Sequence, residues 1–136
     1  MKRLIVILLL LIPLLSVAQT FTDSNLPIVV IETDGHVNIP DEPKVLGTMK
    51  IIWHQDGSRN YLTDINNPEF LNYDGRIGIE IRGSSSQMLQ KKPYGLETLQ
   101  ADNVTNNNVS ILGMPFSIET LWLFAFAAKS KNTLLM

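Results

Sequence analysis

The stretch Arg76-Ile-Gly-Ile-Glu-Ile-Arg82 carries the clearest strand signal of the chain. Its isoleucines alternate with small or charged residues, and this period of two predicts a strand with one apolar and one polar face. The small residues of Gly83-Ser84-Ser85-Ser86 then interrupt the pattern, and Lys91 to Leu99 reads as a second extended segment. We therefore expect two strands joined by a serine-rich loop.

Further strand candidates lie on the amino-terminal side of this pair. Leu26 to Ile31 is a compact, β-branched run, and the Asp34-Gly35 pair after it is typical of a tight turn. Val37 to Ile39 is the candidate return strand, and Val45 to Trp53 is a second long strand candidate with alternating apolar residues. Between these and Arg76, residues Arg59 to Gly75 are rich in Asn, Asp, Pro and aromatic types, which favours an ordered loop.

The carboxyl-terminal side is more polar at first and then strongly apolar. Ala101 to Asn108 is an asparagine-rich turn region, and Val109 to Met114 is either a short strand or a turn before Pro115. The pattern of residues 116–136 suits a strand as well as a helix. The predicted fold class is mostly β, with several strands joined by tight turns and no helix expected before residue 116.

The first residues have the layout of a secretory signal peptide. Lys2 and Arg3 are followed by an almost unbroken apolar run, Leu4 to Leu15, and then by the small residues of Ser16-Val17-Ala18-Gln19. The apolar run is too short to cross a bilayer as a helix, for which about 20 residues are needed. We expect cleavage after Ala18 or Gln19, and export to the cell envelope or the medium, with membrane contact only during export.

Composition narrows the classes of partner and fold. The chain has 136 residues, 11 basic and 13 acidic, so removal of Lys2 and Arg3 leaves 9 − 13 = −4. A mildly acidic chain has no overall attraction for nucleic acid, and the absence of cysteine excludes disulfides and thiolate chemistry. The mature part suffices for one modest domain. The expected organisation is a signal peptide over 1–19, a β-rich region over 20–115 and a divergent tail over 116–136.

The serine-rich loop and the lysines that follow it are the candidate binding site. Backbone N–H groups of Gly83 to Ser86 can approach an anion closely, hydroxyl groups add donors, and Lys91 or Lys92 can supply charge to phosphate oxygens. A β-hairpin with two solvated lysines explains the same residues without any ligand. Neighbouring strand residues face opposite sides, so at most one of the two lysines points at a bound group.

Five segments together resemble the amino-terminal part of the CotH (spore-coat-protein-H-like) kinase family, in an exported bacterial form. They occur in the order Leu26-Pro-Ile-Val-Val-Ile31, Ile39-Pro-Asp-Glu-Pro-Lys44, Ile77-Gly-Ile-Glu-Ile-Arg-Gly-Ser-Ser-Ser-Gln-Met88, Lys91-Lys-Pro-Tyr-Gly-Leu-Glu97 and Val109-Ser-Ile-Leu-Gly-Met-Pro115. The resemblance implies the β-rich, nucleotide-covering lobe of an atypical protein kinase fold. It also implies transfer of phosphate from ATP, with Mg²⁺, to Ser or Thr of secreted or surface proteins.

The resemblance assigns cofactor-binding roles and marks where the chain departs from the family. Arg82, Gly83, Ser84, Ser85 and Ser86 match the loop near the phosphates, and Lys91 or Lys92 matches the basic strand. The family's metal-binding and catalytic acidic residues come later, so no catalytic or metal-ligating residue is predicted here.

The tail departs from the family pattern. Glu119-Thr-Leu-Trp122 stands where the family usually has Glu-Asn-Asp-Trp. This departure favours a truncated or frameshifted reading frame. Without the family's metal-binding carboxylates, this polypeptide is expected to be inactive alone.

Other readings are weaker or belong to a different class. His36 and His54 flank turns and are expected to be solvated rather than a zinc pair, and the acidic residues lack the spacing of a Ca²⁺ loop. Asn103 and Asn108 begin glycosylation sequons, which recur by chance. The alternative function is a non-catalytic exported β-rich module that binds a surface protein or a polysaccharide.

Overall fold

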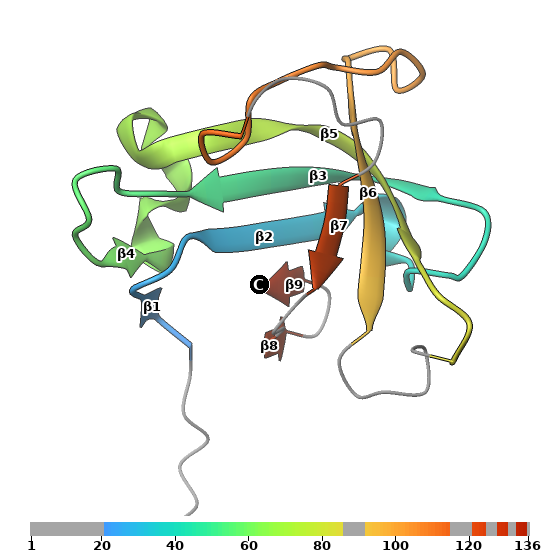
Figure 1. Cartoon of the computed structure of the whole chain (residues 1–136), viewed down its shortest axis with the longest axis horizontal. Helices are drawn as coiled ribbons and strands as arrows, with labels where there is room; N and C mark the ends of the chain where they lie inside the picture. Colours follow the sequence, from blue (N-terminus) through green and yellow to red (C-terminus); the bar gives the residue numbers. More distant parts are fainter. Residues whose placement is uncertain (1–20, 86–91, 115–120, 125–127, 131–132, 136) are drawn as a thin grey trace, which may run out of the picture.

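The computed structural model describes residues 21–85, 92–114, 121–124, 128–130 and 133–135, and these form a mostly β structure, as predicted (Figure 1). Seven strands make one antiparallel sheet in the order β7-β6-β5-β3-β2-β9-β8, and β1 pairs with β4 in a second, two-stranded sheet. The strands are β1 Asp23–Ser24, β2 Ile28–Thr33, β3 Val45–Ile52, β4 Asn60–Tyr61, β5 Leu71–Ile81, β6 Pro93–Leu99, β7 Leu121–Phe124, β8 Ala128–Ser130 and β9 Thr133–Leu135.

The antiparallel pairing of β2 with β3 corrects one prediction. The two strands pair from Ile28 with Ile52 to Thr33 with Gly47, so β3 occupies this whole edge of β2. The expected return strand over Val37–Ile39 is wrong, because these residues belong to the connection between the two strands. A 3-10 turn, η2 Asp34–His36, begins that connection, with Gly35 at φ 64°.

The strand around the isoleucines is longer than predicted. It begins at Leu71, inside the expected loop, and pairs with β3 on one side and β6 on the other. The rest of the expected loop holds β4 and two 3-10 helices, η3 Leu62–Asn66 and η4 Pro68–Phe70. In Figure 1 the long β5 bends, so that β6 crosses the direction of β2 and β3, as a strongly twisted sheet requires.

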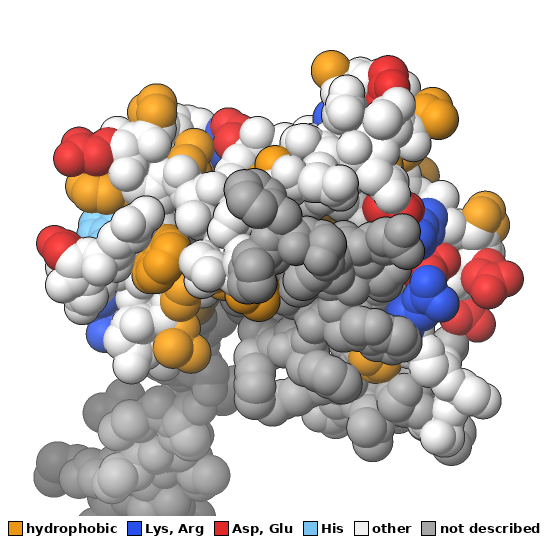
Figure 2. Space-filling model, turned by 45° about the horizontal axis from the view of Figure 1, so that its top comes forward, with side chains coloured by type: hydrophobic (Ala, Val, Ile, Leu, Met, Phe, Trp, Pro, Cys, Tyr) orange, Lys and Arg blue, Asp and Glu red, His pale blue; other side chains and the backbone are white. Residues whose placement is uncertain are grey.

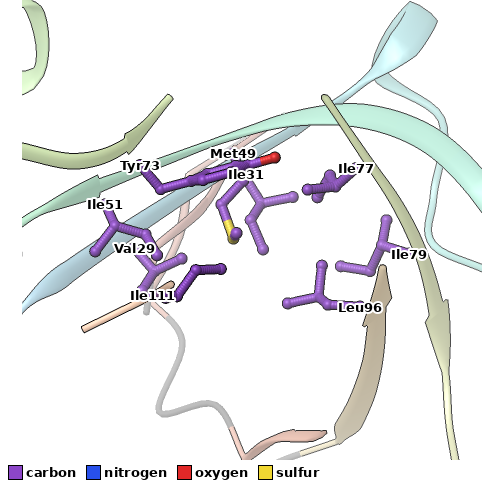
Figure 3. Close-up of a cluster of buried hydrophobic side chains, with 9 residues drawn as sticks. All are labelled: Val29, Ile31, Met49, Ile51, Tyr73, Ile77, Ile79, Leu96 and Ile111. Atoms are coloured by element: carbon purple, nitrogen blue, oxygen red, sulfur yellow. The ribbon is translucent and has the colours of Figure 1, made fainter. Parts of the chain in front are cut away.

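The main core lies on one face of this twisted sheet (Figure 3). The alternation read from the sequence places the isoleucines of β5 in it, with Ile77 and Ile79 fully buried. Side chains of four strands and one loop meet there, where they remove apolar surface from water. The buried members are Val29, Ile31, Met49, Ile51, Tyr73, Ile77, Ile79, Leu96 and Ile111.

A second cluster covers the opposite face at one end of β2 and β3. Ile28, Val30 and Ile52 are buried there under residues from η3, η4 and the chain near Phe21. Burial on both faces explains why the amino-terminal apolar run is continuous, since a strand with one wet face would alternate.

The segment between β6 and residue 114 packs over the main core as a turn. Ile111 is buried, and Leu112 donates its backbone N–H to Asn72 Oδ1 at 2.8 Å. Leu112 and Gly113 have φ of 53° and 74°, so this part of Val109–Met114 is a turn rather than a strand.

The described parts of the 116–136 tail are strands. β7 pairs with β6, and β9 pairs with both β2 and β8. In the described ranges no helix is long and apolar enough to span a membrane.

Candidate anion-binding hairpin

The β5–β6 hairpin brings the two parts of the predicted site to one end of the sheet. Arg82 donates its backbone N–H to the carbonyl oxygen of Pro93 at 2.9 Å, which closes the hairpin just beyond its last strand pair. The loop therefore leaves the sheet at Gly83 and returns at Lys92. Ser86 and Lys91, two of the predicted site residues, lie outside the described residues.

The described loop residues face solvent. Gly83, Ser84, Ser85 and Lys92 are all exposed, and Gly83 has φ 84°, a conformation that glycine adopts without steric cost. These features permit backbone and hydroxyl donors to reach a ligand, with the Lys92 ammonium on the opposite arm of the loop. The part of the predicted site that is described is thus gathered in one place.

Arg82 is positioned differently from the other loop residues. Its Nε lies 2.7 Å from Glu80 Oε1, and only 8% of the Glu80 side chain is exposed. The two residues are two positions apart on one strand, so their side chains lie on the same face of the sheet. The polar face predicted for β5 is therefore substantially buried at Glu80, and Arg82 supplies a compensating charge.

Gly95 makes room for this ion pair. It sits opposite Glu80 on β6, and a Cβ atom there would lie 2.8 Å from Arg82 Nε and 2.9 Å from Arg82 Cγ. The Arg82 side chain consequently lies flat across the neighbouring strand. A glycine inside a strand often marks such a close approach, so this residue could have been singled out from the sequence.

A second ion pair stands next to the first on this face. Lys44 Nζ lies 2.8 Å from Glu97 Oε2, and both side chains are roughly three-quarters buried. Glu97 is opposite Gly78, whose missing side chain leaves space beside Lys44 Cδ. Figure 2 shows side chains of both signs gathered on the side of the molecule where Figure 1 places the 37–44 loop and the end of β5.

The loop beside β3 also contacts the hairpin directly. Ile81 donates its backbone N–H to the Pro40 carbonyl oxygen at 2.7 Å, beyond the point where β3 pairs with β5. On the core side, burial raises the pKa of the Tyr94 phenol, which is opposite Ile81. The base of the loop is thus held by the Pro40 carbonyl oxygen, and the described residues of the loop itself, Gly83, Ser84, Ser85 and Lys92, are exposed.

The groups at the described part of the loop suit an anion. Glu80 and Glu97, which lie near the base of the hairpin loop, are each paired with a cation. Within the described ranges no three His, Cys, Asp or Glu side chains are gathered where they could hold a metal. A phosphate group could use the loop amides, the serine hydroxyls and Lys92.

Sequence reasoning missed four residues of this surface, Lys44, Glu80, Gly95 and Glu97.

Comparison of the chain with protein-family models, with curated proteins and with solved structures found no match.

Proposed function

We propose that this chain is the amino-terminal, nucleotide-covering part of an exported CotH-like atypical protein kinase. In this proposal the whole enzyme phosphorylates Ser or Thr of secreted or surface proteins with ATP and Mg²⁺. The β5–β6 hairpin supplies contacts to the ATP phosphates. The acidic residues that would hold Mg²⁺ are not among the residues at this hairpin.

The observation that carries the proposal is the closed hairpin end. The hydrogen bond between Arg82 and Pro93 sets Gly83 opposite Lys92, and the exposed Ser84 and Ser85 follow Gly83 in the loop. A flexible loop would have to lose conformational freedom on binding, whereas a loop anchored at its base loses less. The resemblance over residues 25–115 then names the anion as the phosphates of ATP.

Export is the second part of the proposal. Residues 1–19 have the charge and apolar pattern of a cleaved signal peptide, and they lie outside the described residues. Edman sequencing or mass spectrometry of the secreted chain should find a new amino terminus after Ala18 or Gln19. An intact amino terminus on the exported product would contradict this assignment.

Thermal unfolding with and without Mg-ATP tests the nucleotide site. A ligand at 100 times its Kd stabilises the folded state by about 2.7 kcal/mol, which gives a clear rise in Tm. Lys92→Ala should raise the ATP concentration needed for the same rise in Tm by about 10- to 150-fold, since a charge-assisted contact to phosphate is worth about 1.5–3 kcal/mol.

Lys50→Ala is the matched control for that variant. Lys50 is in β3 and pairs with Asp74 at 3.4 Å, away from the hairpin loop. Lys50→Ala should leave the rise in Tm caused by Mg-ATP unchanged. A cooperative transition that ATP does not shift would overturn the nucleotide site and favour the alternative, a non-catalytic module that binds a surface protein or polysaccharide.

A further inference from the structure

His54 is not the solvated turn residue that its sequence position suggests. Its side chain is only 9% exposed, and the imidazole stacks on Phe70 with ring centroids 3.9 Å apart and planes 28° apart. The backbone N–H of His54 donates to Oδ1 of the buried Asn60 at 2.7 Å. The ring and its backbone are therefore both held in place.

Each ring nitrogen of His54 has a hydrogen-bond partner: a carboxylate for one and a hydroxyl for the other. Nε2 lies 3.0 Å from Asp64 Oδ2, and Nδ1 lies 2.8 Å from Ser58 Oγ. A carboxylate oxygen accepts hydrogen bonds, so we assign the proton of the neutral ring to Nε2, where it is donated to Asp64. Nδ1 is then left as an acceptor for the Ser58 hydroxyl proton, which is the arrangement that activates a serine.

Ser58 is accessible, whereas the base behind it is shielded. Ser58 is exposed on the turn after β3, and the Asp64 side chain is 22% exposed. The turn itself is fixed, because Asp56 Oδ1 accepts the Ser58 backbone N–H at 2.9 Å and the His54 carbonyl oxygen accepts the Gly57 N–H at 3.2 Å. A reagent in solvent can thus reach a hydroxyl whose proton acceptor is already in position.

We propose that Ser58 is a base-activated nucleophile that accepts acyl groups from activated esters. Ser58 Oγ attacks the ester carbonyl carbon, and its proton passes to His54 Nδ1. The bond to the leaving oxygen breaks, so the products are an acylated Ser58 and an aryl oxide, with the proton released from His54 to solvent. Asp64 is a positioning residue, which orients the ring and stabilises the imidazolium.

The surroundings of Ser58 define which esters can react. The backbone amides of Gly57 and Ser58 are already engaged, so neither stabilises the negative charge that develops on the carbonyl oxygen. The substrate must therefore carry a good leaving group. This site is distinct from the β5–β6 hairpin, and the inference does not depend on nucleotide binding.

The test is labelling of the full chain with p-nitrophenyl acetate. We expect a stoichiometric release of p-nitrophenolate and a single acetyl group on the peptide that contains Ser58, located by mass spectrometry. Ser58→Ala should abolish this acetylation. Ser110→Ala is the matched control, because Ser110 is also exposed but donates its hydroxyl to the Met114 carbonyl oxygen at 2.5 Å.

Two further variants separate activation from folding. His54→Gln should slow acetylation of Ser58 by about 100-fold, at the low end of what a general base contributes. Asp64→Asn should also slow it, while Asp64→Glu should restore part of the rate, and a circular dichroism melt checks that each variant folds. Acetylation of Ser58 at an unchanged rate in His54→Gln, or equal acetylation of Ser110 and Ser58, would overturn the proposal.

Discussion

At the residue scale, Gly47 is required by the close approach of β2. A Cβ at this position would lie 2.5 Å from the Glu32 carbonyl oxygen and 3.1 Å from Thr33 Cα. These are backbone atoms, which cannot move aside without disturbing the strand pairing. We expect Gly47→Ala to lower the free energy of unfolding by about 1–3 kcal/mol in urea denaturation.

Gly78→Ala is the matched control for this prediction. The nearest atom to its added Cβ is Lys44 Cδ at 3.5 Å, an ordinary contact. An alanine in a strand interior also restricts the unfolded chain, so this variant should be neutral or stabilising by about 0.5 kcal/mol. Equal losses in the two variants would refute the steric explanation for Gly47.

Tyr73 gives the core a defined response to alkaline pH. Its hydroxyl donates to the Arg76 carbonyl oxygen at 2.8 Å, and burial, followed by the charge of Asp74, raises the phenol pKa above its usual value. The stability that Tyr73 contributes is therefore fully present below about pH 10, where the unfolded phenol titrates, and is lost above it.

Tyr73→Phe keeps the ring and removes the hydroxyl. At neutral pH this variant should have a free energy of unfolding lower by about 1 kcal/mol, the net value of one hydrogen bond. Urea denaturation from pH 8 to 11 should then show a smaller alkaline decline in the variant than in the parent chain. Parallel declines would mean that groups other than Tyr73, such as Tyr94, account for the effect.

At the element scale, the β5–β6 hairpin depends on a glycine that faces an ion pair. Gly95→Ala would place a Cβ within 3 Å of Arg82 Nε and Cγ, so the Arg82 side chain must shift, and we expect this to weaken its pairing with Glu80. Since Glu80 is nearly buried, separating the pair should cost about 1–3 kcal/mol. We expect Gly95→Ala to be less destabilising in an Arg82→Ala background, with a coupling energy of about 0.5–3 kcal/mol.

Gly47→Ala is the internal control for this double-mutant cycle of Gly95→Ala and Arg82→Ala. Gly47 lies on the core face of the same sheet. Gly47 clashes with β2 rather than with Arg82, so Gly47→Ala and Arg82→Ala should be additive within about 0.5 kcal/mol. Additivity of Gly95→Ala with Arg82→Ala would show instead that the Arg82 side chain does not occupy the space above Gly95 in solution.

At the scale of the whole molecule, the turn that follows β6 closes the main core. Ile111 contributes the buried side chain of that turn, and only 7% of it is exposed. We expect Ile111→Ala to lower the free energy of unfolding by about 2–5 kcal/mol and to increase binding of a dye that reports exposed apolar surface. Val104→Ala, in the same turn region but 80% exposed, should change neither.

The same turn region is tied to two other parts of the chain by one arginine. Arg76 in β5 donates to Asp34 Oδ1 at 2.9 Å and to Asn103 Oδ1 at 2.5 Å. Hydrogen bonding from Arg76 lowers the pKa of the Asp34 carboxyl. Three segments far apart in sequence therefore meet at one side chain, and no local sequence pattern predicts this contact.

Strands whose two faces differ, or whose apolar residues form a dense run, could be predicted from the amino-acid sequence alone. The alternating isoleucines of β5 and the β-branched run of β2 are local patterns, because side-chain direction repeats every two residues. The serine-rich loop and its lysines were likewise visible as the end of one strand and the start of the next. The function inferred from them stays a prediction.

Which segments pair, and which polar groups are buried, follows from the folded arrangement and not from local sequence patterns. Val37–Ile39 has a strand-like composition, yet β3 takes its place because it matches β2 over six residue pairs. Glu80 and Gly95 come together through the register of β5 and β6, and His54 gains its partners from a folded turn and η3. These three arrangements depend on contacts between residues distant along the chain or on the path of a turn. A local sequence period predicts neither such contacts nor such a path.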